Sequence, residues 1–423
     1  MDMKKKMRCT LILCIIAIVI TSITGCSGTV NTNYDHHFTD NGELVKESAR
    51  KEFKLQEPSK VKFYVEVSGS MNGYFRANCP TDFKTDVWEV ISYYSVRADN
   101  VCILTNDGSQ GASVGINDFQ TLMNTGSFVS TASTKVPLML RTIIDSLNVN
   151  AGEVAVLISD MKYSPVGASA PEVLMAQYST DIATILSKFG KAVSLVGATS
   201  NYLDKNGKEV CVKSPYYFFI IGNAGQVAEM RNGISYLLSQ RNHFIDNIDS
   251  GFDFGIPKYS FGITNRCEQL DDEPTFTGYE EQEDGDTCYI ELKVKLEDYR
   301  WILADKSVFR NALKVTPKYG SEVKVGEIKM EVENVTGDNK ELKREATATV
   351  KLEIYNMATD SEVIEWNLEL PDTDYTLFAP YFDNTTGEND PSKSYSLIDF
   401  VKGIFQGGVV NKKLSPNYIL VSK

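Results

Sequence analysis

KFYVEVSGSMNG, at residues 62–73, is an apolar strand that ends on a carboxylate and then breaks into a loop of hydroxyl groups and glycines. Apolar residues alternate with polar ones up to Val67, which is typical of a strand, and Gly69 and Gly73 permit tight turns. Ser68 and Ser70 stand two residues apart, so a curled loop can aim both hydroxyls at one point. Oxygen ligands suit Mg2+, Mn2+ or Ca2+ rather than zinc. The loop is therefore a candidate metal site, and the alternative is an ordinary polar turn.

Apolar strand patterns alternate with helical patterns over residues 59–245, which predicts an α/β domain with a doubly wound, mostly parallel sheet. Strands are expected at residues 61–67, 101–105, 153–159, 191–197 and 216–222. Helices are expected at residues 83–97, 136–147, 171–189 and 224–239. Ligands of such sheets bind at the carboxyl ends of the strands. The Ser68 loop and Asp160, which directly follows a buried strand, both fall on that edge.

The sequence EVSGS, at residues 66–70, resembles the first motif of the von Willebrand factor type A family, written Asp-x-Ser-x-Ser. Two further motifs follow in the family's order, with Thr134 before an expected helix and Asp160 at the end of the next strand. In that family two serines, a threonine and an aspartate form a metal-ion-dependent adhesion site. The resemblance implies that Ser68, Ser70, Thr134 and Asp160 hold a divalent cation here.

Two details of this resemblance, which covers about residues 60–240, stay open. Glu66 stands where the family has aspartate. Its extra methylene either lets the carboxylate replace a bridging water or crowds the site and weakens metal binding. Thr131 and Ser133 are near enough to Thr134 to substitute for it if the loop takes another register.

The N-terminus has the pattern of an export signal. Residues 1–25 combine a basic start, an apolar run from Leu11 to Ile20 and a small-residue end. The alternative is a single membrane-spanning helix, but the apolar run is shorter than the roughly 20 residues that such a helix needs. The ending ITGC resembles a bacterial lipobox, which implies a lipid on Cys26. We expect a protein anchored outside the cytoplasmic membrane, at the cell surface or in the periplasm, through a linker at residues 26–58 with a short helix near 43–54.

Charge and composition exclude several classes of function. The net charge is −13, and a chain that starts at Cys26 carries −16, because residues 1–25 hold four basic side chains and one acidic one. This argues against nucleic acid as a partner, since phosphate binding needs a basic patch. His243 is the one histidine inside an expected domain, which disfavours imidazole-based triads and zinc sites. Cys267 and Cys288 are able to pair in an exported protein, or to remain thiols.

From residue 250 to residue 423 the pattern changes to short alternating strands, which indicates a β-sandwich-like domain. The clearest strands are expected at residues 287–296, 323–332, 346–355 and 363–370. A helix at 396–405 and a last strand at 418–421 close the chain, and the sequence does not say which domain they join.

Together these patterns favour a binding protein rather than an enzyme. A cation held by neutral hydroxyls and few carboxylates stays electrophilic, so a carboxylate of a protein partner would bind it. A metal-free scaffold for an envelope complex is the first alternative, and Glu66 favours it. A metal-assisted hydrolase is the second, but no nucleophile-elbow or aspartyl-phosphate motif accompanies the candidate residues.

Overall fold

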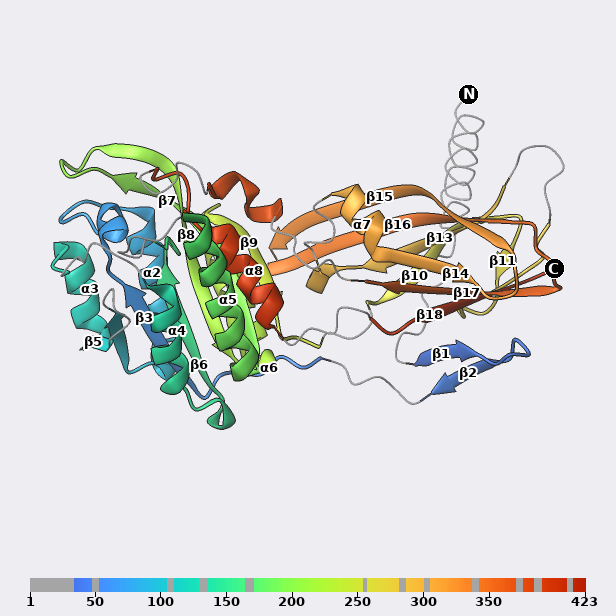
Figure 1. The fold of residues 1–423 in the computed structure, drawn as a ribbon, viewed down its shortest axis with the longest axis horizontal. Helices are drawn as coiled ribbons and strands as arrows, with labels where there is room; N and C mark the ends of the chain where they lie inside the picture. The colour runs from blue at the N-terminus through green and yellow to red at the C-terminus, as the bar shows by residue number, and fades with distance from the viewer. Residues whose placement is uncertain are drawn as a thin grey trace, which may run out of the picture.

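The computed structural model shows an α/β unit at one end and a β-rich unit at the other (Figure 1). It describes residues 34–47, 53–104, 110–128, 135–163, 171–253, 257–280, 287–299, 305–336, 342–369, 376–383, 390–408 and 414–423. The predicted signal segment, Cys26 and Thr134 lie outside these residues.

The α/β unit is built on a seven-stranded sheet with the strand order β5-β4-β3-β6-β8-β7-β9. The strands are β3 (Lys60–Glu66), β4 (Asn100–Leu104), β5 (Gln110–Gly115), β6 (Glu153–Ser159), β7 (Ala192–Leu203), β8 (Glu209–Gly222) and β9 (Phe244–Ser250). β3 pairs in parallel with β4 and β6, whereas the remaining pairs are antiparallel. The predicted α/β class is confirmed, but the sheet is mixed rather than mostly parallel.

The hairpin of β7 and β8 causes this difference. Both strands extend well beyond the apolar runs predicted at 191–197 and 216–222; the outer part of β8 is exposed, whereas β7 stays mostly buried. The turn is closed by Asp204, whose carboxylate accepts hydrogen bonds from Asn206 N and Lys208 N. The predicted strands are too short to meet at a hairpin turn, so the pattern does not predict that β8 returns antiparallel and inserts beside β6.

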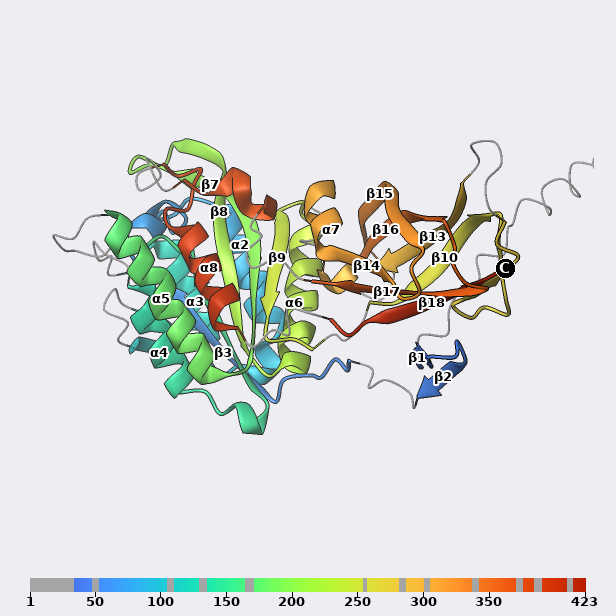
Figure 2. The ribbon, with the colours of Figure 1, turned by 45° about the vertical axis from the view of Figure 1, so that its right-hand side comes forward.

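Helices cover both faces of the sheet, so it is doubly wound (Figure 2). One face packs against α2 (Asp82–Tyr93), α3 (Ile116–Thr125) and α6 (Ala224–Ser239). The other packs against α4 (Val136–Asp145), α5 (Pro171–Phe189) and α8 (Leu397–Gly407). Five of these helices, including α8, lie close to predicted ones, whereas α3 and the two edge strands β5 and β9 were not predicted. Thr81, rather than Asp82, caps α2 by accepting a hydrogen bond from Lys84 N.

α8 comes from the C-terminal part of the chain but belongs to the core of the α/β unit. Phe400 and Ile404 are fully buried there, and α8 lies along α5. A Cβ at Gly403 would lie 2.6 Å from Cβ of Ile182, so the two helices approach closely because this residue is glycine. The predicted β-sandwich-like span of 250–423 therefore includes a helix that packs on the other unit.

The β-rich unit consists of two sheets that share one core. One sheet has the order β10-β13-β16-β15, with β10 (Tyr259–Asn265), β13 (Cys288–Lys295), β16 (Leu342–Tyr355) and β15 (Glu322–Thr336). The other has the order β11-β12-β18-β17-β14, with β11 (Glu268–Gln269), β12 (Thr275–Thr277), β18 (Asn417–Ser422), β17 (Ser361–Leu368) and β14 (Leu313–Pro317). A short helix, α7 (Lys306–Ala312), precedes β14. Two facing sheets are the layered arrangement that the sequence predicts.

The predicted linker holds a β-hairpin in its described part. β1 (Asp35–Phe38) pairs with β2 (Leu44–Glu47) and packs against β18. Gly42 has a positive φ of 76°, and its N–H donates to Thr39 O at 2.9 Å. The helix expected near residues 43–54 is therefore wrong at β2. Asn41 and Gly42 form a dipeptide that favours hairpin turns, and this is the sequence signal for the hairpin.

Glu362 fixes the connection between β14 and β15. It is completely buried on β17, and its carboxylate accepts hydrogen bonds from the main-chain N–H groups of Lys318 (2.8 Å), Tyr319 (2.7 Å) and Ser321 (2.9 Å). Main-chain donors that are buried without a partner are costly. Glu362 is therefore the side-chain acceptor for Tyr319 and Ser321 at this turn. It shares the Lys318 N–H with Val363 O, which lies 2.9 Å from Lys318 N.

We predict that Glu362→Gln lowers the free energy of unfolding of the β-rich unit by about 2–4 kcal/mol, because an amide supplies one acceptor oxygen where the carboxylate supplies two. Urea unfolding of the two proteins measures the difference. Glu365→Gln, three residues along the same strand at a half-buried position, is the matched control and should change stability little. Equal losses in both variants would contradict the proposed anchoring role.

Candidate functional site

The loop after β3 forms a short 3-10 helix, η1 (Gly69–Gly73), that is anchored by its central residue. The side chain of Met71 is fully buried in the core, and its N–H donates to Ser68 O at 3.1 Å. With the middle of the loop held down, the hydroxyls of Ser68 and Ser70 lie 2.9 Å apart. The convergence of these two hydroxyls, which the spacing predicts, is present.

Tyr202 of β7 holds the loop from the side. Its hydroxyl donates to Ser70 O at 2.9 Å. A Cβ at Gly73 would lie only 2.2 Å from the Tyr202 ring, so glycine is required there for close packing. The sequence predicts Gly73 in a tight turn but not its contact with Tyr202, because the two residues are more than a hundred positions apart.

Asp160 follows β6 at the same edge of the sheet and is buried, with 1% of its surface exposed. Its Oδ1 accepts a hydrogen bond from Lys162 N at 3.2 Å, and its main-chain oxygen accepts one from the Ser394 hydroxyl at 2.8 Å. Among the described residues, its Oδ2 has no partner within hydrogen-bonding geometry. Burial raises the pKa of this carboxyl, while Lys162 and the nearby Ser70 hydroxyl lower it. Ser70 therefore lies beside Asp160, with one carboxyl oxygen left over.

Glu66 is completely buried one strand position below the loop. Its Oε2 accepts a hydrogen bond from the Ser159 hydroxyl, which in turn accepts one from Met161 N at 2.8 Å. Met161 has a φ of 55°, a left-handed conformation that turns the chain directly after Asp160. The contact with Ser159 ties the ends of β3 and β6 together. No local sequence pattern predicts this contact, because Ser159 and Glu66 are 93 residues apart in the chain.

Aromatic side chains surround the Asp160 carboxyl. Burial raises the pKa values of the Tyr74 and Tyr202 hydroxyls, and the Asp160 charge raises them further. The same two causes act on Tyr178, together with neighbouring Tyr163, Asp399 and Glu66. These shifts show a poorly solvated environment, in which electrostatic interactions are stronger than in water.

The donor set suits a hard divalent cation. Two hydroxyls and a carboxyl group are oxygen ligands of the kind that Mg2+, Mn2+ and Ca2+ prefer. No group of three or more His, Cys, Asp or Glu side chains in the described part of the chain is arranged to hold a metal ion. A metal site here would thus be built mainly on hydroxyls. Thr134, the fourth expected ligand, lies outside the described residues.

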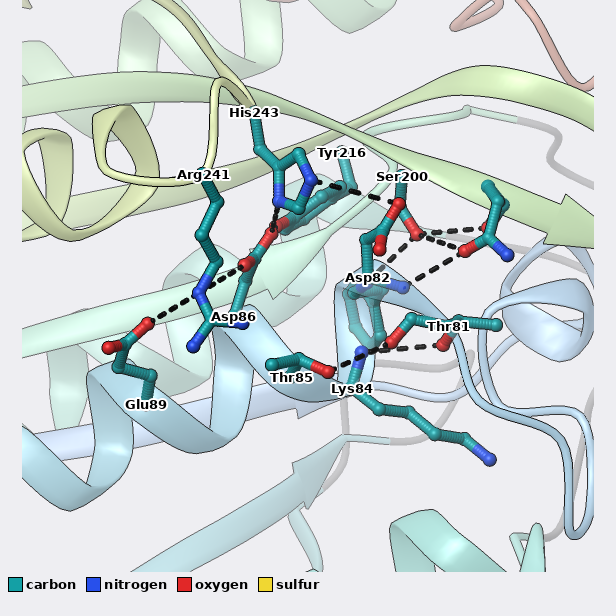
Figure 3. Close-up of polar contacts among 12 residues, drawn as sticks. Thr81, Asp82, Lys84, Thr85, Asp86, Glu89, Ser200, Tyr216, Arg241 and His243 are labelled. Atoms are coloured by element: carbon teal, nitrogen blue, oxygen red, sulfur yellow. Dashed lines mark hydrogen bonds and ion pairs between the residues drawn. The ribbon is translucent and has the colours of Figure 1, made fainter.

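A second polar cluster joins α2 to the turn before β9 (Figure 3). Asp86 is buried. Its Oδ2 accepts a hydrogen bond from the Tyr216 hydroxyl at 2.7 Å and lies 2.8 Å from His243 Nδ1. The other ring nitrogen of His243 lies 3.8 Å from Asp82. His243 is therefore placed between two carboxyl groups, and this geometry clamps α2 rather than activating a nucleophile.

Asp86 gives a pH-dependent contribution to stability. Burial raises its pKa, against the opposing effects of Tyr216, His243 and Arg241. The folded state therefore binds this proton more tightly than the unfolded state, so the contribution of Asp86 to stability falls as the pH rises above the ordinary aspartate value of about 4.

We predict that the wild type loses stability relative to Asp86→Asn as the pH is raised from about 4 to neutrality. The reason is that the wild type must then bury a charged carboxylate, whereas asparagine stays neutral. Urea unfolding of both proteins across this range measures it. Asp118→Asn, at an exposed position on α3, is the control and should show no comparable trend. A difference that is flat with pH would refute this role of burial.

Comparisons with protein-family models, with curated proteins and with solved structures found no match for this chain. Within the described residues, no helix combines the length and the apolar character needed to cross a membrane.

Proposed function

We propose that the protein is a cell-envelope lipoprotein that binds a protein partner through a divalent cation at the edge of its α/β unit. Ser68, Ser70 and Asp160 would hold the cation, with Thr134 as a further ligand from the segment before α4. The observation that carries the proposal is the meeting of two hydroxyls, 2.9 Å apart, with the buried Asp160 carboxyl, which Ser70 contacts and whose Oδ2 has no geometric hydrogen bond among the described residues. The fold family suggested by the sequence, the von Willebrand factor type A family, is part of this proposal.

The chain's own residues prepare this edge for binding. Tyr202 and Met71 fix the loop, so both hydroxyls are held in place before any ligand arrives. Glu66 is engaged by Ser159, which leaves Asp160 as the carboxyl at the rim. A cation bound by these groups would be an electrophile for a carboxylate of the partner. This is a binding function, and the proposal includes no catalytic step.

The described residues also favour one rival, a metal-free scaffold. Lys162 lowers the pKa of Asp160 through its charge, and its ammonium group donates to Asp390 O at 3.0 Å. A lysine fixed near a buried carboxyl offsets part of its charge without a metal ion. In that case the edge would be a structural feature of an assembly subunit.

The envelope location rests on the sequence of the N-terminus. The proposed anchor is a lipid on Cys26, close before the β1–β2 hairpin. Because that hairpin packs against β18, the anchor would attach at the β-rich unit. In Figure 1 the β7–β8 hairpin beside the candidate site extends at the opposite end of the molecule. The binding edge would then face away from the membrane.

The proposal predicts that the chain from residue 26 onward binds Mg2+ or Mn2+, and that the double variant Ser68→Ala/Ser70→Ala weakens binding at least about tenfold, because it removes two ligands. Isothermal titration calorimetry measures both affinities. The control is Ser113→Ala/Ser187→Ala, at exposed positions on β5 and α5, which should bind like wild type.

Two results would overturn the metal site. Equal affinity in wild type and the Ser68/Ser70 variant would place any cation elsewhere. No binding in either protein would favour the scaffold, in which Lys162 offsets the charge of Asp160.

A further inference from the structure

The β-rich unit buries two cysteines next to each other. Cys267 and Cys288 are 5% and 1% exposed and belong to the same core. Both are free thiols in the structure. Two buried thiols in contact are either apolar packing or a pair ready for oxidation.

The strand register places them together. Asn265, the last residue of β10, pairs with Tyr289 of β13. The residues just after Asn265 therefore lie beside Cys288, the first residue of β13. Arg266 then takes a left-handed conformation with φ of 56°, which turns the chain from one sheet toward the other. The next residue is Cys267, whose Sγ lies 3.9 Å from Tyr289 O. The turn at Arg266 thus points Cys267 at the start of β13.

The two sulfurs differ in character. A hydrogen bond to Cys288, together with burial, raises the pKa of the Cys267 thiol. The same hydrogen bond lowers the pKa of Cys288, an effect to which the Arg266 charge adds and which burial opposes. Cys288 is therefore the better nucleophile and Cys267 the thiol that donates to it.

We propose that Cys267 and Cys288 form a structural disulfide that staples the crossover between the two sheets. The oxidant is a disulfide of the small-molecule or oxidoreductase class, and it reaches the thiols during folding, after β10 and β13 have paired and brought them together but before the rest of the core closes. The Cys288 thiolate attacks one sulfur of that disulfide, forms a mixed disulfide and expels a first thiolate. Cys267, as a thiolate, then attacks Sγ of Cys288 and expels a second. Two thiols of the chain become one disulfide, their two protons pass to the two released thiolates, and the oxidant is reduced.

The bond would close the loop of residues 267–288, which carries β11 and β12. β11 is a two-residue edge strand, and β12 joins its sheet through a parallel pairing with β18 over two residue pairs. Such short edge strands have few hydrogen bonds to hold them. A covalent link at both ends of the loop restricts the unfolded chain and keeps these strands in register. This role is independent of the candidate metal site.

The test uses the full chain, unfolded and then refolded with a mixture of oxidised and reduced glutathione. Free thiols are alkylated in denaturant, and unreduced peptides are identified by mass spectrometry. We expect a peptide pair linked through Cys267 and Cys288 that is lighter by two hydrogen atoms and separates on reduction. The unfolding midpoint of the oxidised protein should exceed that of the reduced protein by several degrees. In Cys288→Ser this shift should vanish, whereas Cys102→Ser, on β4, should keep both the link and the shift.

Alkylation of both Cys267 and Cys288 in the refolded wild type, or a link to another cysteine, would overturn the proposal even if a variant failed to fold. The same peptide analysis on the protein from its own cells separates this proposal from the proposed location. A linked pair there supports both. A pair that is linked after refolding but free in cells would leave the disulfide-competent pair standing and argue against an oxidising envelope compartment.

Discussion

The parallel register of β3 and β6 is the constraint on which the candidate site depends. Val65 lies opposite Ile158, so both strands end at the same level and their following residues meet. The hydrogen bond from Ser159 to Glu66 joins the last residues of both strands and so fixes this register. A slip of one residue would exchange the faces of every side chain on the shifted strand. The hydroxyls of the η1 loop would then no longer lie beside Asp160.

Local patterns predicted those parts of the fold that bury one continuous face. β3, β4 and β6, and helices α2, α4, α5 and α6, have strong apolar periodicity and lie close to their expected positions. The outer part of β8 and the β1–β2 hairpin are partly exposed and lack a continuous apolar run, so the sequence pattern there is weak. Periodicity also cannot tell which unit a helix covers. α8 was expected as a helix, but its partner α5 lies more than two hundred residues earlier in the chain.

The candidate site, like the fold, could be predicted from local sequence only in part. The pairing of Ser68 with Ser70 follows from their spacing, and the place of Asp160 follows from its position after a buried strand. Tyr202, Ser159 and Ser394 reach the site through contacts that are distant in sequence, so no local pattern announces them. The buried carboxyls also differ in what surrounds them. Glu362 is saturated by three main-chain donors, whereas Asp160 keeps one oxygen without a hydrogen bond among the described residues.

The path of the chain between the two units affects how the protein is made. After β17 the chain leaves the β-rich unit, supplies α8 to the α/β unit and then returns as β18. During synthesis, the sheet built from residues 60–250 would wait for residues 397–407 before the face that carries α4 and α5 is fully covered. Folding of one unit at a time from the ribosome, the usual order for multidomain chains, is therefore not available to this protein. Both units reach their final packing only when α8 and β18 have emerged.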